Sequence, residues 1–197
     1  MARARPQGGA TPTATGAWEV PDSYVYFMDR GLVAALGVLM AGGSVIELGA
    51  GKGCYTAALR RRGVAASAYD GGPNIAQLTG GLVQRADLTK ELGLAPADWV
   101  LCLETAEHIP HQFEGVLLRN MLGAARVGVV LSWSNNEGGN GHVNLRTNEW
   151  VVARMASLGF AHDAAAQRDL RRSISHIHWF RETLMAFRRS GSSAKRT

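Results

Sequence analysis

A carboxylate followed by three alternate glycines is the feature of this sequence with the clearest chemical meaning. Glu47 stands where a short apolar run, read as a buried strand, comes to its end. Gly49, Gly51 and Gly53 then form a turn into a helix expected over residues 54–62. Glycines accept the positive φ angles of such a turn, and without Cβ atoms they let a ligand approach the backbone. Because the free N–H groups of a helix N-terminus point toward the same place, the segment predicts a binding site for a nucleotide-like ligand.

The order apolar-apolar-Glu-x-Gly-x-Gly-x-Gly resembles the first motif of class I S-adenosylmethionine (SAM)-dependent methyltransferases. It differs from the dinucleotide fingerprint G-x-G-x-x-G, because Cys54 stands in the place of the third glycine. A carboxylate at Glu47 would repel the pyrophosphate of NAD, whereas SAM carries an ammonium group and a sulfonium. On this resemblance Glu47 and the three glycines bind SAM. A nicotinamide-dependent oxidoreductase would share the fold and stays as an alternative, as does a glycine-rich turn that binds no ligand.

Two aspartates follow the next two expected strands, and the resemblance assigns both to the nucleoside part of SAM. Asp70 ends the second strand, where its carboxylate can accept hydrogen bonds from both ribose hydroxyls. The structural alternative is an Asx-type turn into Gly71-Gly72, where relatives often carry a larger residue against the adenine. Asp87 follows the third strand and resembles the residue that meets the adenine amino group. Helix capping is its alternative, and the two roles do not exclude each other.

The segment from Glu104 to Pro110 carries a second group of chemically active side chains. It resembles the fourth-strand motif of small-molecule methyltransferases, whose usual form ends in Glu-His-Ile/Val-Pro. The resemblance implies that Glu104, at the strand tip, lies beside the cofactor and that Glu107 lies beside the substrate. It gives His108 a catalytic or substrate-orienting role, with a purely structural histidine as the alternative. The Asn-Pro-Pro-Tyr type signature of many amino-group nucleic-acid methyltransferases does not occur here, which argues against a nucleic-acid substrate.

A long polar loop follows the fifth expected strand, at 127–133. Long polar loops in compact domains are usually functional or disordered, and this one leaves the strand on the ligand edge. Trp133 and Asn144 are therefore assigned to the substrate. His142 is a second candidate for the general base, since similar Gly-His-Val-Asn segments occur in relatives. His108 and His142 with their acidic neighbours would suit a metal, but no spacing matches a ligand set, so no metal is predicted.

Strands alternate with helices along most of the chain, which predicts an α/β fold with parallel strands and right-handed crossovers. The resemblance implies a Rossmann-like, doubly wound, mostly parallel seven-stranded sheet with helices on both faces, in which the last strand enters antiparallel. Strands are expected from Ser44 and at 65–69, 81–85, 99–103, 127–133 and 183–188. Helices are expected at 23–40, with Asp22 as N-cap, and at 54–62, 73–79, 113–124 and 148–158, with a further turn of helix through 109.

Composition and charge exclude several classes of protein. The 197 residues suffice for one domain, and no apolar run approaches the roughly 18 residues of a membrane span. Six of the basic residues stand near the termini, and the other 15 lie with all 16 acidic residues within 19–187, for a net charge of −1 there. This distribution argues against nucleic-acid binding. The two cysteines suggest no disulfide framework, so a reducing, cytoplasmic location is the simplest interpretation.

The domain is expected to span residues 18–189. Residues 1–17, rich in Ala, Thr, Gly and Pro, are predicted to be a disordered tail, as are residues 190–197. The composition of the first segment also fits an organelle transit peptide.

The function predicted from these features is methyl transfer from SAM, with S-adenosylhomocysteine (SAH) as product, to a small molecule. A hydroxyl acceptor needs a base, and a histidine with a pKa near neutrality suits that task, so O-methylation is slightly preferred. The protein must otherwise align the nucleophile and exclude water. A catalytically silent methyltransferase-like partner protein stays as a further alternative, because fold does not imply function.

Overall fold

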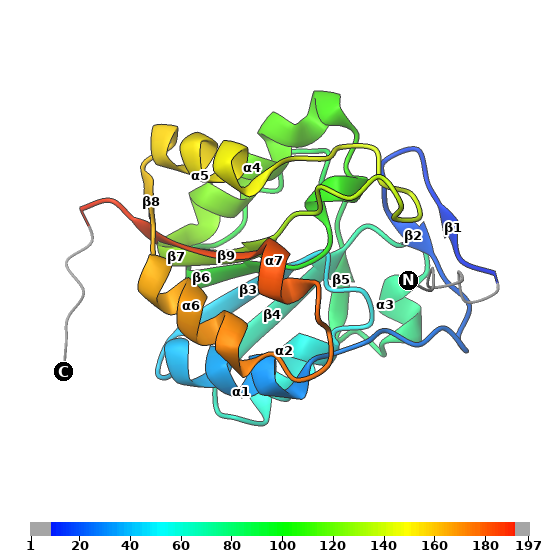
Figure 1. Ribbon diagram of the computed structural model, residues 1–197. Helices are drawn as coiled ribbons and strands as arrows, with labels where there is room; N and C mark the ends of the chain where they lie inside the picture. The colour runs from blue at the N-terminus through cyan, green and yellow to red at the C-terminus, as the bar shows by residue number, and fades with distance from the viewer. Residues whose placement is uncertain (1–8, 192–197) are drawn as a thin grey trace.

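A seven-stranded sheet forms the centre of the computed structural model, which describes residues 9–191 (Figure 1). In sheet order the strands are β5 (Val83–Arg85), β4 (Ala65–Asp70), β3 (Ser44–Leu48), β6 (Ala97–Cys102), β7 (Ala125–Ser132), β9 (Leu184–Arg189) and β8 (Phe160–His162). The pairs from β5 to β7 are parallel, and β9 pairs antiparallel with both β7 and β8. The predicted mostly parallel α/β sheet with an antiparallel last strand is confirmed.

Helices cover both faces of this sheet (Figure 1). One face carries α4 (Glu114–Ala124) and α5 (Asn148–Ser157), and the other carries α1 (Arg30–Leu39), α2 (Cys54–Arg60) and α6 (Ala164–Ser173). Successive side chains of a strand point to opposite faces. In β6, Val100 and Cys102 therefore join the α4 layer, while Trp99 and Leu101 join the α1 layer. Because both faces are buried, the strand is apolar from Trp99 to Cys102.

The strand order reverses between β3 and β6. β4, which follows β3 along the chain, lies on one side of β3. β6 lies on the other side, and β7, which follows β6 along the chain, lies beyond it. Loops that leave the carboxyl ends of such strands diverge, and ligands of doubly wound folds bind in the crevice between them. The short elements α3 (Ile75–Leu78), η1 (Ala106–His108) and η2 (His111–Phe113) belong to these connections. The topology thus gathers the predicted site residues at one edge.

The first helix is shorter than predicted, because its N-cap is Asp29 and not Asp22. α1 begins at Arg30, and the Asp29 carboxylate accepts a hydrogen bond from the Leu32 N–H group at 2.9 Å. The same carboxylate, fully buried, also accepts bonds from the backbone N–H groups of residues 175–177. Asp22 is exposed. Both aspartates are acceptable caps by local sequence, and the distant 175–177 segment decides between them.

Three C-terminal elements lie where the sequence predicts none: β8, α6 and α7 (Phe180–Thr183). In α6 the buried side chains are only those of Ala166 and Leu170, so the helix has a weak apolar pattern. Its start is set by Asp163, whose side chain accepts from the Ala166 N–H group at 3.0 Å. β8 has three residues, of which only Phe160 is buried, and such a short strand leaves no alternation to detect.

The N-terminal segment corrects the predicted disordered tail for residues 9–17. β1 (Thr11–Pro12) pairs antiparallel with β2 (Trp18–Glu19), and together they form a small hairpin beside the carboxyl edge of the main sheet (Figure 1). At the other end, the Ser190 N–H group donates to the Gly159 carbonyl at 2.8 Å. The predicted tails at 1–8 and 192–197 lie outside the described residues. Within residues 9–191, no helix has the length and hydrophobicity to cross a membrane.

Candidate functional site

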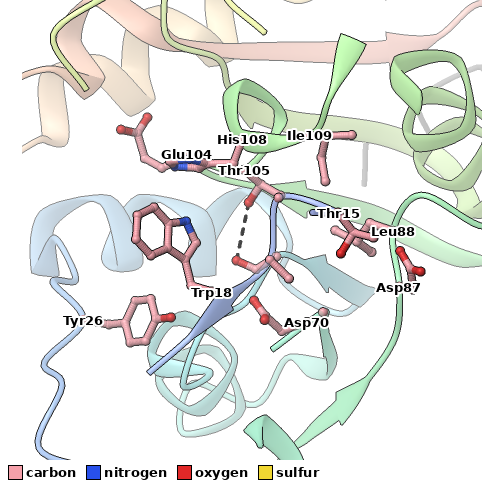
Figure 2. Close-up of a pocket in the computed structure, with 14 residues that line it drawn as sticks. Thr15, Trp18, Tyr26, Asp70, Asp87, Leu88, Glu104, Thr105, His108 and Ile109 are labelled. Atoms are coloured by element: carbon pink, nitrogen blue, oxygen red, sulfur yellow. Dashed lines mark hydrogen bonds between the residues drawn. The ribbon is translucent and has the colours of Figure 1, made fainter. Parts of the chain in front are cut away.

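A pocket opens where the loops after β3, β4, β5 and β6 meet the N-terminal hairpin (Figure 2). Its cavity volume is about 50 Å³, within about 450 Å³ of space outside the protein atoms that includes open solvent. The sequence-predicted site residues that line it are Gly49, Asp70, Asp87, Glu104 and His108. Residues far apart in the chain are thus brought together at the edge that the topology predicts.

The glycine turn after β3 adopts the left-handed backbone that the sequence predicts. Gly49, Gly51 and Gly53 have φ angles of 74°, 52° and 72°. The N–H groups of Gly49 and Ala50 donate to the Tyr69 carbonyl, and that of Gly51 donates to the Asp70 carboxylate at 2.8 Å. A bound pyrophosphate would need such N–H groups as donors. The turn therefore suits a ligand without phosphate groups.

Glu47 does not line this pocket, and the cofactor contact expected of it stays a prediction. Its carboxylate is 3% exposed and accepts bonds from the N–H and hydroxyl groups of Thr56, at 2.9 and 2.5 Å. Burial raises the pKa of this carboxyl to about 7, although the two bonds from Thr56 act against the rise. Glu47 thus ties the N-terminus of α2 to the end of β3. The engaged N–H groups of the turn, and not the charge of Glu47, disfavour the pyrophosphate of NAD.

Asp70 lies in the pocket wall and also performs the turn role considered for it. Its two carboxylate oxygens accept from the N–H groups of Gly51 and Gly72, each at 2.8 Å. Burial raises its pKa, and these two hydrogen bonds oppose the rise. Each oxygen can accept more than one bond, so acceptor capacity remains for hydroxyl groups of a ligand.

Asp87 lies on the opposite side of the pocket from Trp18 and Tyr26 (Figure 2). It accepts bonds from the N–H and hydroxyl groups of Thr89, at 3.0 and 2.6 Å, and forms an ion pair with Lys90 at 3.7 Å. Residues 88–90 form a turn and not the helix that Asp87 was expected to cap, so its carboxylate bonds within this turn instead. Its position in the pocket wall leaves the predicted adenine contact open as a second role.

Glu104 has an unusual backbone at the end of β6. Among the described residues it is the one non-glycine with a positive φ, at 47°. Such a conformation is strained and persists where surrounding contacts hold it. Here the Glu104 N–H group donates to the Ser132 hydroxyl, which donates in turn to the Glu104 carboxylate at 2.8 Å. Burial raises the pKa of this carboxyl, against the hydrogen bonds from Ser132 and Trp179.

The two histidines lie beside each other, as the predicted common site requires. The rings of His108 and His142 are 5.1 Å apart between centroids, and Trp18 packs on His108 with its centroid 5.6 Å away. Burial lowers the pKa of His108 to about 4, partly opposed by a bond to the Gly141 carbonyl. An unperturbed histidine, as expected from the sequence, has a pKa near 6.5. His108 is therefore neutral at physiological pH and a weaker base than expected.

Glu107 is fully buried, next to these rings. Within the described part of the chain, neither of its carboxyl oxygens has a hydrogen-bond partner of good geometry. Burial, together with the charge of Glu104, raises its pKa well above the usual range. Glu107, His108 and His142 each offer an atom that lies within 4.8 Å of the other two, a grouping that the sequence spacing did not reveal.

Trp133 and Asn144 do not line this pocket, and their expected substrate contacts stay predictions. Trp133 is 1% exposed in the core and packs on Trp150. Its indole N–H donates to the Asn144 carbonyl at 2.7 Å, which anchors the end of the polar loop. The Asn144 side chain is 2% exposed, and among residues 9–191 its amide has no hydrogen-bond partner.

Three N-terminal side chains of the pocket, from the hairpin and from the chain that follows it, are not among the site residues predicted from the sequence, which had only the segment from Trp18 onward cover the pocket. Thr15, Trp18 and Tyr26 line it, and the Tyr26 ring covers the glycine turn, since a Cβ on Gly51 would lie 2.5 Å from it. Burial and the nearby Asp70 raise the Tyr26 pKa far above its usual range. The sequence signal that could have identified them is the presence of aromatic residues within the Pro/Gly-rich start of the chain. Ala17 and Trp18 lie against Gly71 and Gly72.

No protein-family model and no curated protein matches this chain. Solved structures do match its fold. A magnesium protoporphyrin IX methyltransferase from Synechocystis PCC 6803 with bound SAH is 15% identical, over 86% of this chain and 90% of that one, with a TM-score of 0.63. The CcbJ methyltransferase from Streptomyces caelestis is 14% identical over 86% and 94%, with a TM-score of 0.63. A 1,6-didemethyltoxoflavin-N1-methyltransferase from Burkholderia thailandensis is 16% identical over 82% and 79%, with a TM-score of 0.52. The chain therefore has the class I SAM-dependent methyltransferase fold.

Proposed function

We propose that this chain transfers the methyl group of SAM to a small molecule, with a hydroxyl oxygen as the preferred acceptor. The proposal is supported by one observation above all: the glycine turn directs its N–H groups to protein acceptors, while three carboxylates line the adjoining pocket. A site of this kind suits a cationic, phosphate-free nucleoside. The matched structures that contain SAM or SAH support the same cofactor.

The pocket residues fit the parts of such a nucleoside. Asp70 would accept hydrogen bonds from the ribose hydroxyls, and Asp87 would accept one from the adenine amino group. Glu104 would face the positively charged methionyl part. The absence of a Cβ at Gly49, which lines the pocket, lets the turn lie close to Thr105, since a Cβ there would lie 2.0 Å from the Thr105 hydroxyl. When bound, SAM would supply a methyl group already activated by sulfonium.

The chain's own contribution to the reaction would be alignment and proton removal. Trp18 and Tyr26 cover one side of the pocket (Figure 2) and would exclude water from the reacting groups. His108 donates its Nδ1–H to the Gly141 carbonyl at 3.1 Å, because a carbonyl oxygen can only accept. Its Nε2 lone pair is then available to an acceptor hydroxyl. A pKa of about 4 makes this nitrogen a weak base on its own.

Calorimetric titration of the purified chain with SAM, SAH and NAD tests the cofactor. We expect one equivalent of SAM and of SAH to bind and NAD to give no heat of binding. Asp70→Asn should weaken SAM binding. Its matched control is Asp163→Asn, which alters a carboxylate that is bonded to Arg188 and lies away from the pocket. Tight binding of NAD without a response to SAM would overturn the proposal. If SAM binds but no SAH forms with any hydroxyl, amine or thiol acceptor tried, the silent partner protein would be favoured.

A further inference from the structure

Three potential metal ligands converge beside the pocket from two segments of the chain. Glu107 and His108 belong to η1, directly after β6, and His142 belongs to the loop that leads to α5. The backbone holds the two segments together, because the N–H groups of Val143 and Asn144 both donate to the Glu107 carbonyl, at 2.9 and 3.0 Å. One ligand atom of each of the three residues lies within 4.8 Å of the others. Small side-chain rotations would place all three at about 2 Å from one ion.

Both imidazole rings are oriented as metal-binding histidines usually are. The Nδ1 atom of His108 lies 3.1 Å from the Gly141 carbonyl oxygen, and that of His142 lies 2.9 Å from the Asn136 carbonyl oxygen. Since a carbonyl only accepts, each Nδ1 carries the proton and each Nε2 carries a lone pair. Histidine ligands of metals typically donate their other ring N–H to a carbonyl or carboxylate in this way.

The third group, Glu107, is independent evidence for a bound ligand. Its side chain is 0% exposed, and within residues 9–191 neither carboxyl oxygen has a hydrogen-bond partner of good geometry, although the backbone N–H groups of Glu107 and Ser134 act to lower its pKa. The Asn144 amide, joined to it through the backbone, is 2% exposed and also lacks partners among these residues. Buried polar groups are nearly always satisfied in native proteins, and an exception calls for an ion, a ligand or a function. The charge of Glu104 close by further favours a cation.

We propose that Glu107, His108 and His142 bind a divalent transition-metal ion whose open coordination positions take the acceptor oxygen of the substrate. Two imidazole nitrogens and one carboxylate suit Zn²⁺, Co²⁺, Mn²⁺ or Fe²⁺, whereas Mg²⁺ and Ca²⁺ prefer oxygen ligands throughout. The donor set leaves coordination positions for substrate or water. The sequence prediction of no metal is thereby replaced, since the spacing Glu107-His108 with His142 becomes a ligand set only through the fold.

The second half of this proposal rests on the proposed methyl transfer. A hydroxyl bound to the ion would lose its proton to water more readily, as metal-bound water does. The oxygen would then form the new bond to the methyl carbon while the sulfur–methyl bond breaks. The electron pair of that bond would return to sulfur, and SAM would leave as the neutral thioether SAH. In this arrangement both histidines would be ligands, and neither would act as the general base.

Titration of the EDTA-treated full chain with CoCl₂, without SAM, tests the metal site directly. The visible d–d absorption of Co²⁺ reports nitrogen-containing coordination, and we expect it to saturate at one equivalent and to be lost on addition of ZnCl₂. His142→Ala and Glu107→Gln should each weaken Co²⁺ binding at least about tenfold. Glu107→Gln keeps the side-chain volume, and far-UV circular dichroism verifies that both variants fold.

His162→Ala is the matched control, since His162 is an exposed histidine on the edge strand β8. It should bind Co²⁺ as the unmodified chain does. Absence of the cobalt spectrum in the unmodified chain would overturn the proposal, as would equal cobalt binding by the folded His142→Ala or Glu107→Gln variants. These readings involve no SAM, so they separate failure of the metal site from failure of the proposed cofactor.

Discussion

Among substitutions of single charged residues, Asp29→Asn should destabilise the protein most. The carboxylate is fully buried and accepts from Leu32, Ser175, His176 and Ile177, at distances from 2.8 to 3.1 Å. It thereby joins the start of α1 to the segment between α6 and α7. Burial by itself would raise the pKa of Asp29, but these backbone hydrogen bonds outweigh it and hold the pKa far below its ordinary value.

The magnitude follows from the number of donors that asparagine cannot satisfy. An asparagine keeps one acceptor oxygen and places an NH₂ group where the other oxygen was. If the NH₂ group takes the place of Oδ1, the Leu32 N–H group faces a donor, and if it takes the place of Oδ2, the N–H groups of His176 and Ile177 do. The Ser175 hydroxyl can rotate and accept instead. Leaving a buried donor unsatisfied costs about 1–3 kcal/mol, so in the better orientation we expect a loss of about 1–3 kcal/mol. For a domain of this size each kcal/mol lowers Tm by roughly 2–4 °C.

Urea unfolding at pH 7, followed by circular dichroism, measures this loss. Ser175→Ala, which removes only the hydroxyl donor, should cost about 1 kcal/mol, and Asp22→Asn, at an exposed position, less than about 0.5 kcal/mol. The carboxylate of Asp29 has a lowered folded-state pKa, so its contribution is complete above the unfolded pKa of about 3.9 and is lost as the pH falls further. The difference between the two proteins should therefore shrink below pH 4. A loss under 0.5 kcal/mol at pH 7, or one that is unchanged at pH 3, would refute the reasoning.

Three further predictions concern the pocket. Gly51→Val should abolish SAM binding in a folded protein, because a Cβ there lies 2.5 Å from the Tyr26 ring; unchanged affinity by calorimetry would contradict this. Asp70→Ala should weaken SAM binding by about 1–3 kcal/mol, the effect of losing hydrogen bonds to a charged group, and equal affinity would remove Asp70 from the site. His108, whose pKa burial lowers to about 4, should stay neutral in NMR titrations down to pH 5. Since the unfolded chain binds this proton more readily, stability should rise with pH between about 4 and 6.5, and a His108 transition near 6.5 would show that burial does not control it.

The sequence was sufficient to predict the parallel strands and the location of the pocket, but not the edge strand β8. The apolar runs before Glu47 and Glu104 are buried on both faces, so local hydrophobicity alone marks them as parallel strands. The positive φ of Gly51 follows from a local preference that only glycine meets without strain. Asp70 follows a strand directly, and the carboxyl end of a parallel strand must lie at the ligand edge. Information of this kind lies within a few consecutive residues.

Other features depend on which distant segment lies nearby, and local patterns do not contain that information. Glu47 follows a strand as Asp70 does, yet Thr56 takes up its carboxylate beneath the turn. Asp29 and Asp22 are equal as local caps until the N–H groups near residue 176 bind one of them. The N-terminal hairpin likewise gains its order from pairing β1 with β2 and from packing on the pocket.

The sequence by itself determined the fold class, the glycine turn and the edge of the sheet that carries the site, because each follows from hydrophobic periodicity or backbone preference. The tertiary structure alone decided how the charged and aromatic side chains are used. His142 is 34 positions from His108 in the sequence, but the backbone bonds to Glu107 place the two rings 5.1 Å apart. Burial, which no local pattern specifies, then lowers the pKa of His108 and leaves the carboxyl oxygens of Glu107 without a hydrogen-bond partner of good geometry among the described residues.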